Sequence, residues 1–261
     1  MADTAFFRIE DGIFIGQDPA RSPWFPDACH GGPVLMLIAR GLESVVDEKQ
    51  LVRVTVTFQR PVPMGGLYLE SHVERSGRAS ASAKSTLRDS KGRICVTGDG
   101  LFIGTGDFGE FPTPAIVGPV FAESHRLPFP ASRSVHGLPY FGNFIEVAFP
   151  PGQSGELGPG TMWMHTPPLL AGEEPTRFQI ACPIADCGNG IGKNANFDVA
   201  SFVNPDVTIA LHRLPRSRWL ASQAISHWQP NGVGLSQATL FDEDGPIGSA
   251  VQTLIVRPAN N

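Results

Sequence analysis

An internal repeat constrains this chain more than any single motif does. Shifting the sequence by 153 positions lays residues 53–103 on residues 206–256 without a gap, and 10 of the 51 aligned positions are identical, where average composition predicts roughly three. The turns match as well, because the segment DSKG at 89–92 falls on DEDG at 242–245. Shared turn chemistry sets strand register, so both halves are expected to form the same hairpins. Two copies indicate a duplicated unit rather than a solenoid.

Each copy has the pattern of a helical segment followed by four strands. Residues 33–44 carry apolar side chains at helical spacing behind a proline, and an apolar segment near residues 175–186 opens the second copy. Alternating or continuous β-forming residues between Gly-, Pro- and Ser-rich turns predict strands at 52–59, 67–74, 79–87 and 94–103, and again at 207–214, 219–226, 233–241 and 247–256. A helix followed by an antiparallel strand series is an α+β unit whose sheet buries one face on the helix.

The repeat also predicts where the units divide. Residues 105–135 hold many prolines, glycines and serines without a sustained period, which is typical of a long connection over the surface. We therefore expect an N-terminal unit over residues 1–110, a connecting segment over 111–135 and a C-terminal unit over 136–261.

Charge and cysteine content restrict the partners. Twenty Lys and Arg against 25 Asp and Glu give a net charge of -5, and without a basic cluster nucleic acid is not an expected partner. Neither a secretory signal nor an apolar run of roughly 18 residues is present, so no membrane partner is expected. The cysteines at 29, 95, 182 and 187 lack a C-x-x-C pair and zinc-finger spacing, which favours reduced thiols and a cytoplasmic location.

In the order of its motifs the chain resembles the double hot-dog acyl-CoA thioesterases, a superfamily that includes bacterial acyl-CoA thioesterase II. The segments that carry the resemblance are HGGPVLMLIARGLE (30–43), VTFQRPVP (56–63), ADCGNG (185–190), FVNPDVTIALHRLPRSRWL (202–220) and DEDGPIGSAVQTLIVRP (242–258). The resemblance implies an α+β double hot-dog fold, with two tandem units that each wrap an antiparallel β-sheet around a central helix. It also implies hydrolysis of an acyl-CoA or related thioester without a metal or other cofactor. Because hot-dog sheets commonly pair, a homo-oligomer is a further expectation.

The resemblance implies a water-activating set of an Asp, a Thr or Ser, and a Gln, all from the second unit. By position, the Asp falls on Asp206 and the Gln on Gln252, while the hydroxyl position falls on Ser226 or His227. A carboxylate can accept the proton of the attacking water, and an amide can orient that water. No G-x-S-x-G turn offers a nucleophilic serine instead.

The repeat supports one competent site, because Asp206 and Gln252 align with Arg53 and Asp99 at offset 153. Each of the two candidates also has a structural interpretation. Asp206 can satisfy a local backbone donor at the start of a strand, and Gln252 can bond to a neighbouring backbone group.

Two segments at helix ends are candidate substrate contacts. His30, Gly31 and Gly32 open the first helix, whose free backbone amides can meet a carbonyl or phosphate oxygen. Asp186 and Gly188 lie in ADCGNG, where Asp186 can line the pocket or satisfy turn amides.

The sequence leaves open the role of one pair of arginines, and it leaves two alternatives to thioester hydrolysis. Arg60 and Arg213 are repeat equivalents, and each can form a structural ion pair or contact a coenzyme A phosphate. A double hot-dog protein that binds an acyl ligand without turnover is the first alternative function, and a dehydratase or hydratase is the second. The D-x(4)-H motif of the hydratases is absent, since five residues separate Asp206 from His212.

Overall fold

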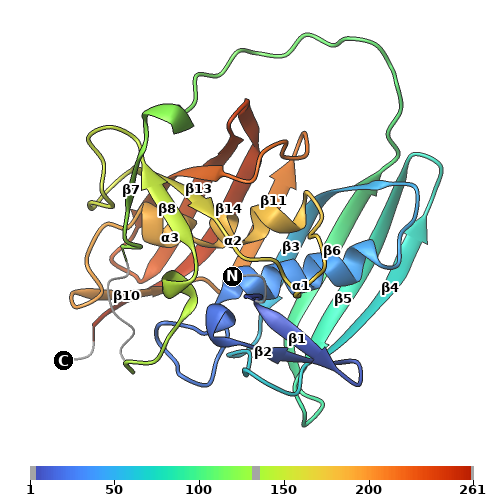
Figure 1. The fold of residues 1–261 in the computed structure, drawn as a ribbon, viewed down its shortest axis with the longest axis horizontal. Helices are drawn as coiled ribbons and strands as arrows, with labels where there is room; N and C mark the ends of the chain where they lie inside the picture. The colour runs from blue at the N-terminus through green and yellow to red at the C-terminus, as the bar shows by residue number, and fades with distance from the viewer. Residues whose placement is uncertain (1–3, 131–135, 260–261) are drawn as a thin grey trace.

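The computed structural model describes residues 4–130 and 136–259. The first half begins with a hairpin of β1 (Phe7–Glu10) and β2 (Ile13–Gly16), a 3-10 turn η1 (Asp18–Ala20) and the helix α1 (Gly31–Glu43). Its four further strands are β3 (Gln50–Phe58), β4 (Tyr68–Ser76), β5 (Ser80–Arg88) and β6 (Ile94–Ile103). The helix packs against β4, β5 and β6 (Figure 1). The helix and the four strands predicted for this half are confirmed to within two residues at either end.

The second half repeats this order with more elements. It contains the 3-10 turns η2 (Phe121–Glu123), η3 (Phe141–Asn143) and η4 (Gln179–Ala181), the strands β7 (His125–Leu127), β8 (Glu146–Phe149) and β9 (Gly160–His165), and the short helices α2 (Cys182–Asp186) and α3 (Gly188–Ile191). The strands that follow are β10 (Ala200–Val203), β11 (Asp206–Leu211), β12 (Leu220–Trp228), β13 (Val233–Asp242) and β14 (Gly245–Pro258). The second helix was expected to end near Asp186; α2 does end there, but α3 continues the helical stretch to Ile191 after a break at Cys187.

One antiparallel sheet joins the two halves. Its strand order is β4-β5-β6-β3-β11-β14-β13-β12-β9-β8-β7, and β10 pairs with β14 beside it. At the junction of β3 and β11, Thr55 lies opposite Thr208, and their hydroxyl oxygens are 3.1 Å apart. Thr208 is the repeat equivalent of Thr55, 153 positions later, so the pseudo-twofold axis of the duplication passes between these two residues. The helices α1 and α2 pack on each other as well.

A hairpin precedes the helix of each half, and the periodicity of the sequence did not predict it. In the first half Phe14 of β2 bridges Leu67, and in the second Met164 of β9 pairs with Leu220. Because Leu67 and Leu220 are repeat equivalents, the two hairpins occupy corresponding places at the ends of their sheets.

The constant offset of 153 is wrong by one residue in the last strand of each half. Thr55 pairs with Asp99 on β6, whereas its equivalent Thr208 pairs with Val251 on β14. The structural counterpart of Gln252 is therefore Gly100 and not Asp99. The two hairpin turns before these strands differ in length, and a slip of one residue moves a side chain to the other face of a sheet. Asp99 accordingly lies on the exposed face, while the side chain of Gln252 is buried.

The connection between the halves arches over the molecule. Residues 104–120 contain no helix or strand and run from the end of β6 to η2 (Figure 1). The strand β7 lies inside the stretch that was expected to be irregular.

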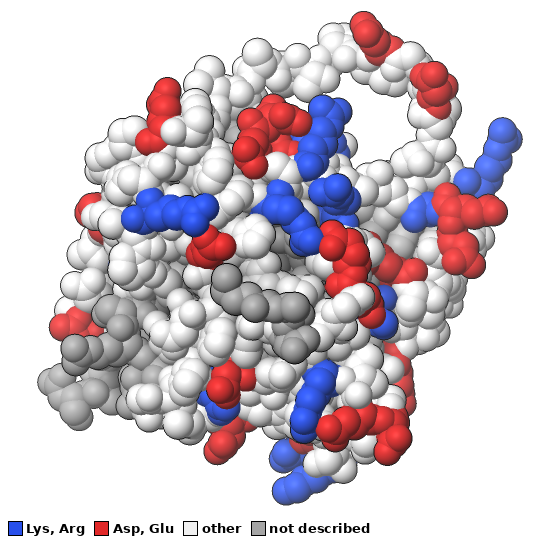
Figure 2. Space-filling model, viewed as in Figure 1, with Lys and Arg blue, Asp and Glu red and all other residues white. Residues whose placement is uncertain are grey.

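Acidic and basic side chains are interspersed on the face in Figure 2. Within the described residues, no helix is both long and apolar enough to cross a membrane.

Candidate active site

A cavity of about 580 Å³ opens where the start of α1 meets α2 and α3. Both halves contribute to its wall, with His30, Gly31 and Arg60 from the first and Asp186, Asn189 and Asn204 among those from the second. Most of the remaining wall is apolar and includes Trp24, Phe25, Phe58, Phe129, Phe149, Phe197 and Phe202. A mostly apolar cavity of this size with a few convergent polar groups is typical of a small-molecule site.

The His-Gly-Gly sequence at the start of α1 has a steric reason. A Cβ atom on Gly31 would lie 2.6 Å from Oδ2 of Asp186, and one on Gly32 would lie 2.9 Å from Cα of Pro183. Both distances are shorter than real Cβ contacts, so glycine is required for the N-terminus of α1 to approach α2. This approach places the carboxylate of Asp186 beside the positive end of the α1 dipole.

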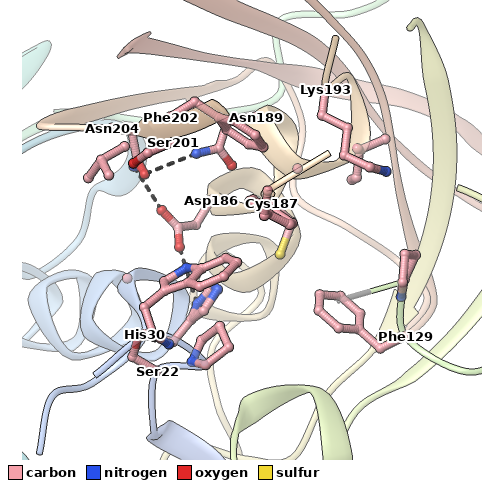
Figure 3. A pocket seen from close by; sticks show the side chains of 18 of the residues that line it. Ser22, His30, Phe129, Asp186, Cys187, Asn189, Lys193, Ser201, Phe202 and Asn204 are labelled. Atoms are coloured by element: carbon pink, nitrogen blue, oxygen red, sulfur yellow. Dashed lines mark hydrogen bonds and ion pairs between the residues drawn. The ribbon is translucent and has the colours of Figure 1, made fainter. Parts of the chain in front are cut away.

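Asp186 is the centre of a polar cluster on the cavity wall (Figure 3). Its side chain is 5% exposed. The Asn204 amide donates a hydrogen bond from Nδ2 to Oδ1 of Asp186 at 3.1 Å, and Nδ1 of His30 lies 3.3 Å from Oδ2. Asn189 joins the cluster, since its Nδ2 donates to Oδ1 of Asn204 at 3.3 Å.

Burial disfavours charge on both ionisable members of this cluster. It raises the pKa of Asp186, against the opposing effects of His30 and Asn204. It lowers the pKa of His30, against the opposing effect of Asp186. Nδ1 of His30 accepts a hydrogen bond from the backbone N–H of Gly32 at 3.1 Å, which requires an unprotonated Nδ1. The His30 ring also stacks on Phe141 with 4.2 Å between centroids, so its orientation is fixed.

Gln252 supports the cluster from the sheet. Its side chain is buried at 1% exposure and does not border the cavity. Oε1 accepts from the backbone N–H of Asn189 at 2.9 Å, and Nε2 donates to the backbone carbonyl of Asp186 at 2.9 Å. Gly188 permits this approach, because a Cβ there would lie 3.1 Å from Oε1 of Gln252. Gln252 thus fixes the junction of α2 and α3.

The other members of the expected water-activating set lie elsewhere. The carboxylate of Asp206 accepts from the backbone N–H of Thr253 at 2.7 Å and from the Thr253 hydroxyl at 3.2 Å. The hydroxyl of Ser226 is buried without a partner among the described residues, and His227 is exposed. Asp206, Ser226 and His227 do not border the cavity. The structure therefore does not bring the expected set together.

Asn189, Asn204 and Lys193 border the cavity and were missed in the sequence. Asp186, Asn189 and Lys193 are spaced i, i+3 and i+7, which places them on one face of a helical segment. That spacing was the available signal. Asn204 had no such signal, because only the packing of the segment before β11 against α2 directs its amide to Asp186.

The two repeat-equivalent arginines have different environments. Arg213 makes a bidentate ion pair with Asp242, with nitrogen–oxygen distances of 2.6 and 2.5 Å. In the first half, Arg93 takes the equivalent carboxylate, Asp89, at 2.7 Å from its Nε. Arg60 is left without an ion pair among the described residues, its Nε is buried without an acceptor, and it lines the cavity.

Comparison with protein-family models shows which family the chain belongs to. An acyl-CoA thioesterase N-terminal domain model matches residues 20–103, and an acyl-CoA thioesterase C-terminal domain model matches residues 121–256. The chain belongs to the acyl-CoA thioesterase family. The expected thioester hydrolase activity and acyl-CoA substrate class are confirmed by this membership.

Solved structures show the same fold at low sequence identity. A protein of Thermobifida fusca YX, named as a candidate thioesterase II, superposes with a TM-score of 0.73 at 16% identity, covering 98% of this chain and 96% of its own. A hot-dog protein of unknown function from Alicyclobacillus acidocaldarius gives a TM-score of 0.72 at 15% identity, covering 98% and 96%. An acyl-CoA thioesterase II from Mycobacterium marinum gives 0.64 at 14% identity, covering 97% and 94%. The expected hot-dog fold is thereby confirmed. No curated protein sequence matches the chain.

Within residues 4–130 and 136–259, no group of three His, Cys, Asp or Glu side chains is placed to hold a metal ion. The four cysteines are free thiols.

Proposed function

We propose that this thioesterase hydrolyses acyl-CoA thioesters with a water molecule activated by Asp186 and oriented by Asn204. The observation that carries the proposal is the buried Asp186 carboxylate on the wall of a mostly apolar cavity, held by Asn204 and by the start of α1. Asp206 lacks such a setting, because its carboxylate is engaged by Thr253 outside the cavity.

The chemistry uses groups that already converge on the cavity. Asp186 accepts a proton from water as the water oxygen bonds to the thioester carbonyl carbon. The side-chain amide of Asn189 carries a second N–H that can stabilise the developing oxyanion, together with the positive end of α1. The carbon–sulfur bond then breaks, and the coenzyme A thiolate takes up the proton held by Asp186. Gln252 is a positioning residue, since it holds the backbone on which Asp186 and Asn189 lie.

The experiment that tests the proposal measures thiol release from a panel of acyl-CoA substrates. The purified chain is incubated with short, medium and aromatic acyl-CoAs and a thiol reagent, and free carboxylic acid is measured in parallel. Equal yields of coenzyme A and acid are expected. Tight binding without release would favour a ligand-binding module, and conversion of an enoyl-CoA without thiol release would favour a hydratase.

The raised pKa of Asp186 predicts the acid side of the pH profile. Because burial raises this pKa above its usual range, near 3.9, the carboxylate is lost, and kcat/KM falls, as the pH drops through the raised value. The hydrogen bond from Asn204 opposes the rise, so Asn204→Leu should move the acid limb to higher pH. The measurement is kcat/KM against pH for both proteins. A limb that moves to lower pH in Asn204→Leu would contradict the role of Asp186.

Arg60 is proposed to bind an anionic group of coenzyme A at the rim of the cavity. Its neighbours Gln59 and Pro61 are exposed, and its guanidinium forms no ion pair with a carboxylate of the described residues. Arg60→Met should raise KM for an acyl-CoA about 10-fold, the usual scale of one hydrogen bond to a charged group. The matching acyl-pantetheine, which lacks the phosphates, should be unaffected. Arg53→Met is the control, because Arg53 is exposed and does not border the cavity.

The finer organisation of the chain completes the proposal. We propose units over 1–110 and 136–261, joined by 111–135, with α1 and the α2–α3 stretch as their central helical segments. The hairpin that precedes each helical segment supports this division. Self-association into a homo-oligomer and a cytoplasmic location stay predictions from the sequence.

A further inference from the structure

Lys193 is a buried cation that the proposed reaction does not use. It follows α3, is 7% exposed and borders the cavity. Its Nζ donates a hydrogen bond to the backbone carbonyl of Gly155 at 2.6 Å. A lysine buried to this degree is rare without a carboxylate partner.

No carboxylate supplies that partner within the described part of the chain. No Asp or Glu oxygen there lies within 4.0 Å of the Lys193 ammonium. Burial lowers the pKa of Lys193, and the charge of Glu156, which also lines the cavity, opposes this shift. Glu156 is exposed, however, and its carboxylate accepts from the backbone N–H of Ser154 at 2.8 Å and from the Ser154 hydroxyl. An ammonium group has three donors, so two remain for a ligand.

Gln153 adds a second donor to the cavity wall. Its Oε1 accepts from the backbone N–H of Thr161 at 2.7 Å, which fixes the amide and leaves Nε2 without a partner among the described residues. A cation and an amide N–H on the wall of one cavity match the needs of a carboxylate better than those of a neutral chain end.

Lys193 lies on the same cavity wall as the reacting centre but apart from it. Asp186, Asn189, Gly190 and Lys193 all border the cavity. Asp186 ends α2, and Lys193 follows the end of α3. In Figure 3, Asn204 and Lys193 lie on opposite sides of the cavity with Asp186 and Cys187 between them.

The wall on the Lys193 side suits an acyl chain rather than the coenzyme. It includes Phe129, Phe149, Met162 and Ile191, which give a chain apolar contacts. The rim near Asn204 instead carries Arg60, the group proposed above for the coenzyme.

We propose that Lys193, with Gln153, binds a carboxylate at the far end of the acyl chain, so that the preferred substrates are ω-carboxyacyl-CoA thioesters. This inference rests on the proposed function, because it takes the thioester carbonyl to lie at Asp186. The substrate class is therefore a dicarboxylic monothioester, with the thioester at Asp186 and the free carboxylate at Lys193.

The test compares two eight-carbon substrates that differ only at the far end, octanoyl-CoA and suberyl-CoA. The wild-type chain should have the higher kcat/KM for suberyl-CoA. Lys193→Met should lower that value at least about 30-fold, as expected for a buried charge that loses its partner, and change the value for octanoyl-CoA less than about 3-fold. Lys193→Arg should retain part of the preference. Lys84→Met is the control, because Lys84 on β5 pairs with Asp99 and does not border the cavity.

The remaining outcomes separate this inference from the proposed function. Equal losses on both substrates would overturn it, because they would mean that Lys193 only holds the loop at Gly155 or contacts the coenzyme. A wild type that hydrolyses octanoyl-CoA without preferring suberyl-CoA would also overturn it and leave the proposed function intact. If neither thioester is hydrolysed, the proposed function fails. Calorimetric titration with free suberate then decides the inference, since suberate should bind the wild type and not Lys193→Met.

Discussion

Asp186→Asn is expected to lower kcat for an acyl-CoA by about 10²- to 10⁴-fold, the usual contribution of a general base. The substitution keeps the shape of the side chain and removes its ability to accept a proton. The amide can still face Asn204, so the fold should survive. Thiol release measures the activity, and circular dichroism with a thermal melt checks the fold.

Asp206→Asn is the matched control for this prediction. It makes the same chemical change at the carboxylate that the sequence alone favoured. Because Asp206 is hydrogen-bonded to Thr253 and does not border the cavity, its variant should hydrolyse acyl-CoA at the parent rate. The reverse result, with activity lost in Asp206→Asn and kept in Asp186→Asn, would restore the assignment made from the sequence.

The groups around Asp186 should act as one unit. Asn204→Ala should lower kcat, and its combination with Asp186→Asn should lose no more than the Asp186 variant alone, since both groups act on the same water. Losses that multiply in the double variant would mean that Asn204 contributes independently of Asp186.

Arg213→Met is expected to lower the free energy of unfolding by about 3 kcal/mol, the low end for breaking a buried ion pair. The Asp242 side chain is 0% exposed, and it receives two hydrogen bonds from the Arg213 guanidinium. Without Arg213, Asp242 keeps only the backbone N–H donors of Arg216 and Asp244. Urea denaturation followed by fluorescence measures the change.

Arg60→Met is the control for Arg213→Met, because the repeat places the two arginines at equivalent positions. Among the residues that the structure describes, Arg60 has no carboxylate partner, since Arg93 pairs with Asp89. Its replacement should change the free energy of unfolding by less than about 1 kcal/mol, although it should weaken binding of acyl-CoA. Similar destabilisation by both substitutions would show that Arg60 has a structural role that its contacts do not reveal.

The sequence by itself determined the duplication, the helix α1, the eight main strands and the family. These depend on local properties, because side-chain periodicity and turn residues act over a few positions. The hairpins before each helix escaped prediction, since β1, β2 and β8 are only four residues long and such short hairpins depend on contacts with the rest of the fold for their stability.

Only the tertiary structure decided which carboxylate belongs to the site. Asp186 and Asp206 are both acidic residues next to regular elements, and nothing local distinguishes them. The distinction arises because Gly31 and Gly32 let α1 approach α2 across the pseudo-twofold axis, which encloses Asp186 in the cavity.

The same holds for Gln252, Arg60 and Lys193. A difference of one residue in a turn directs Gln252 into the core while Asp99 faces solvent. The pairing of Arg93 with Asp89 leaves Arg60 to line the cavity. Lys193 is a cation of the site only because the strands and the 150–160 loop close around it. Sequence patterns set the elements, whereas contacts between residues far apart in the chain select the side chains that meet.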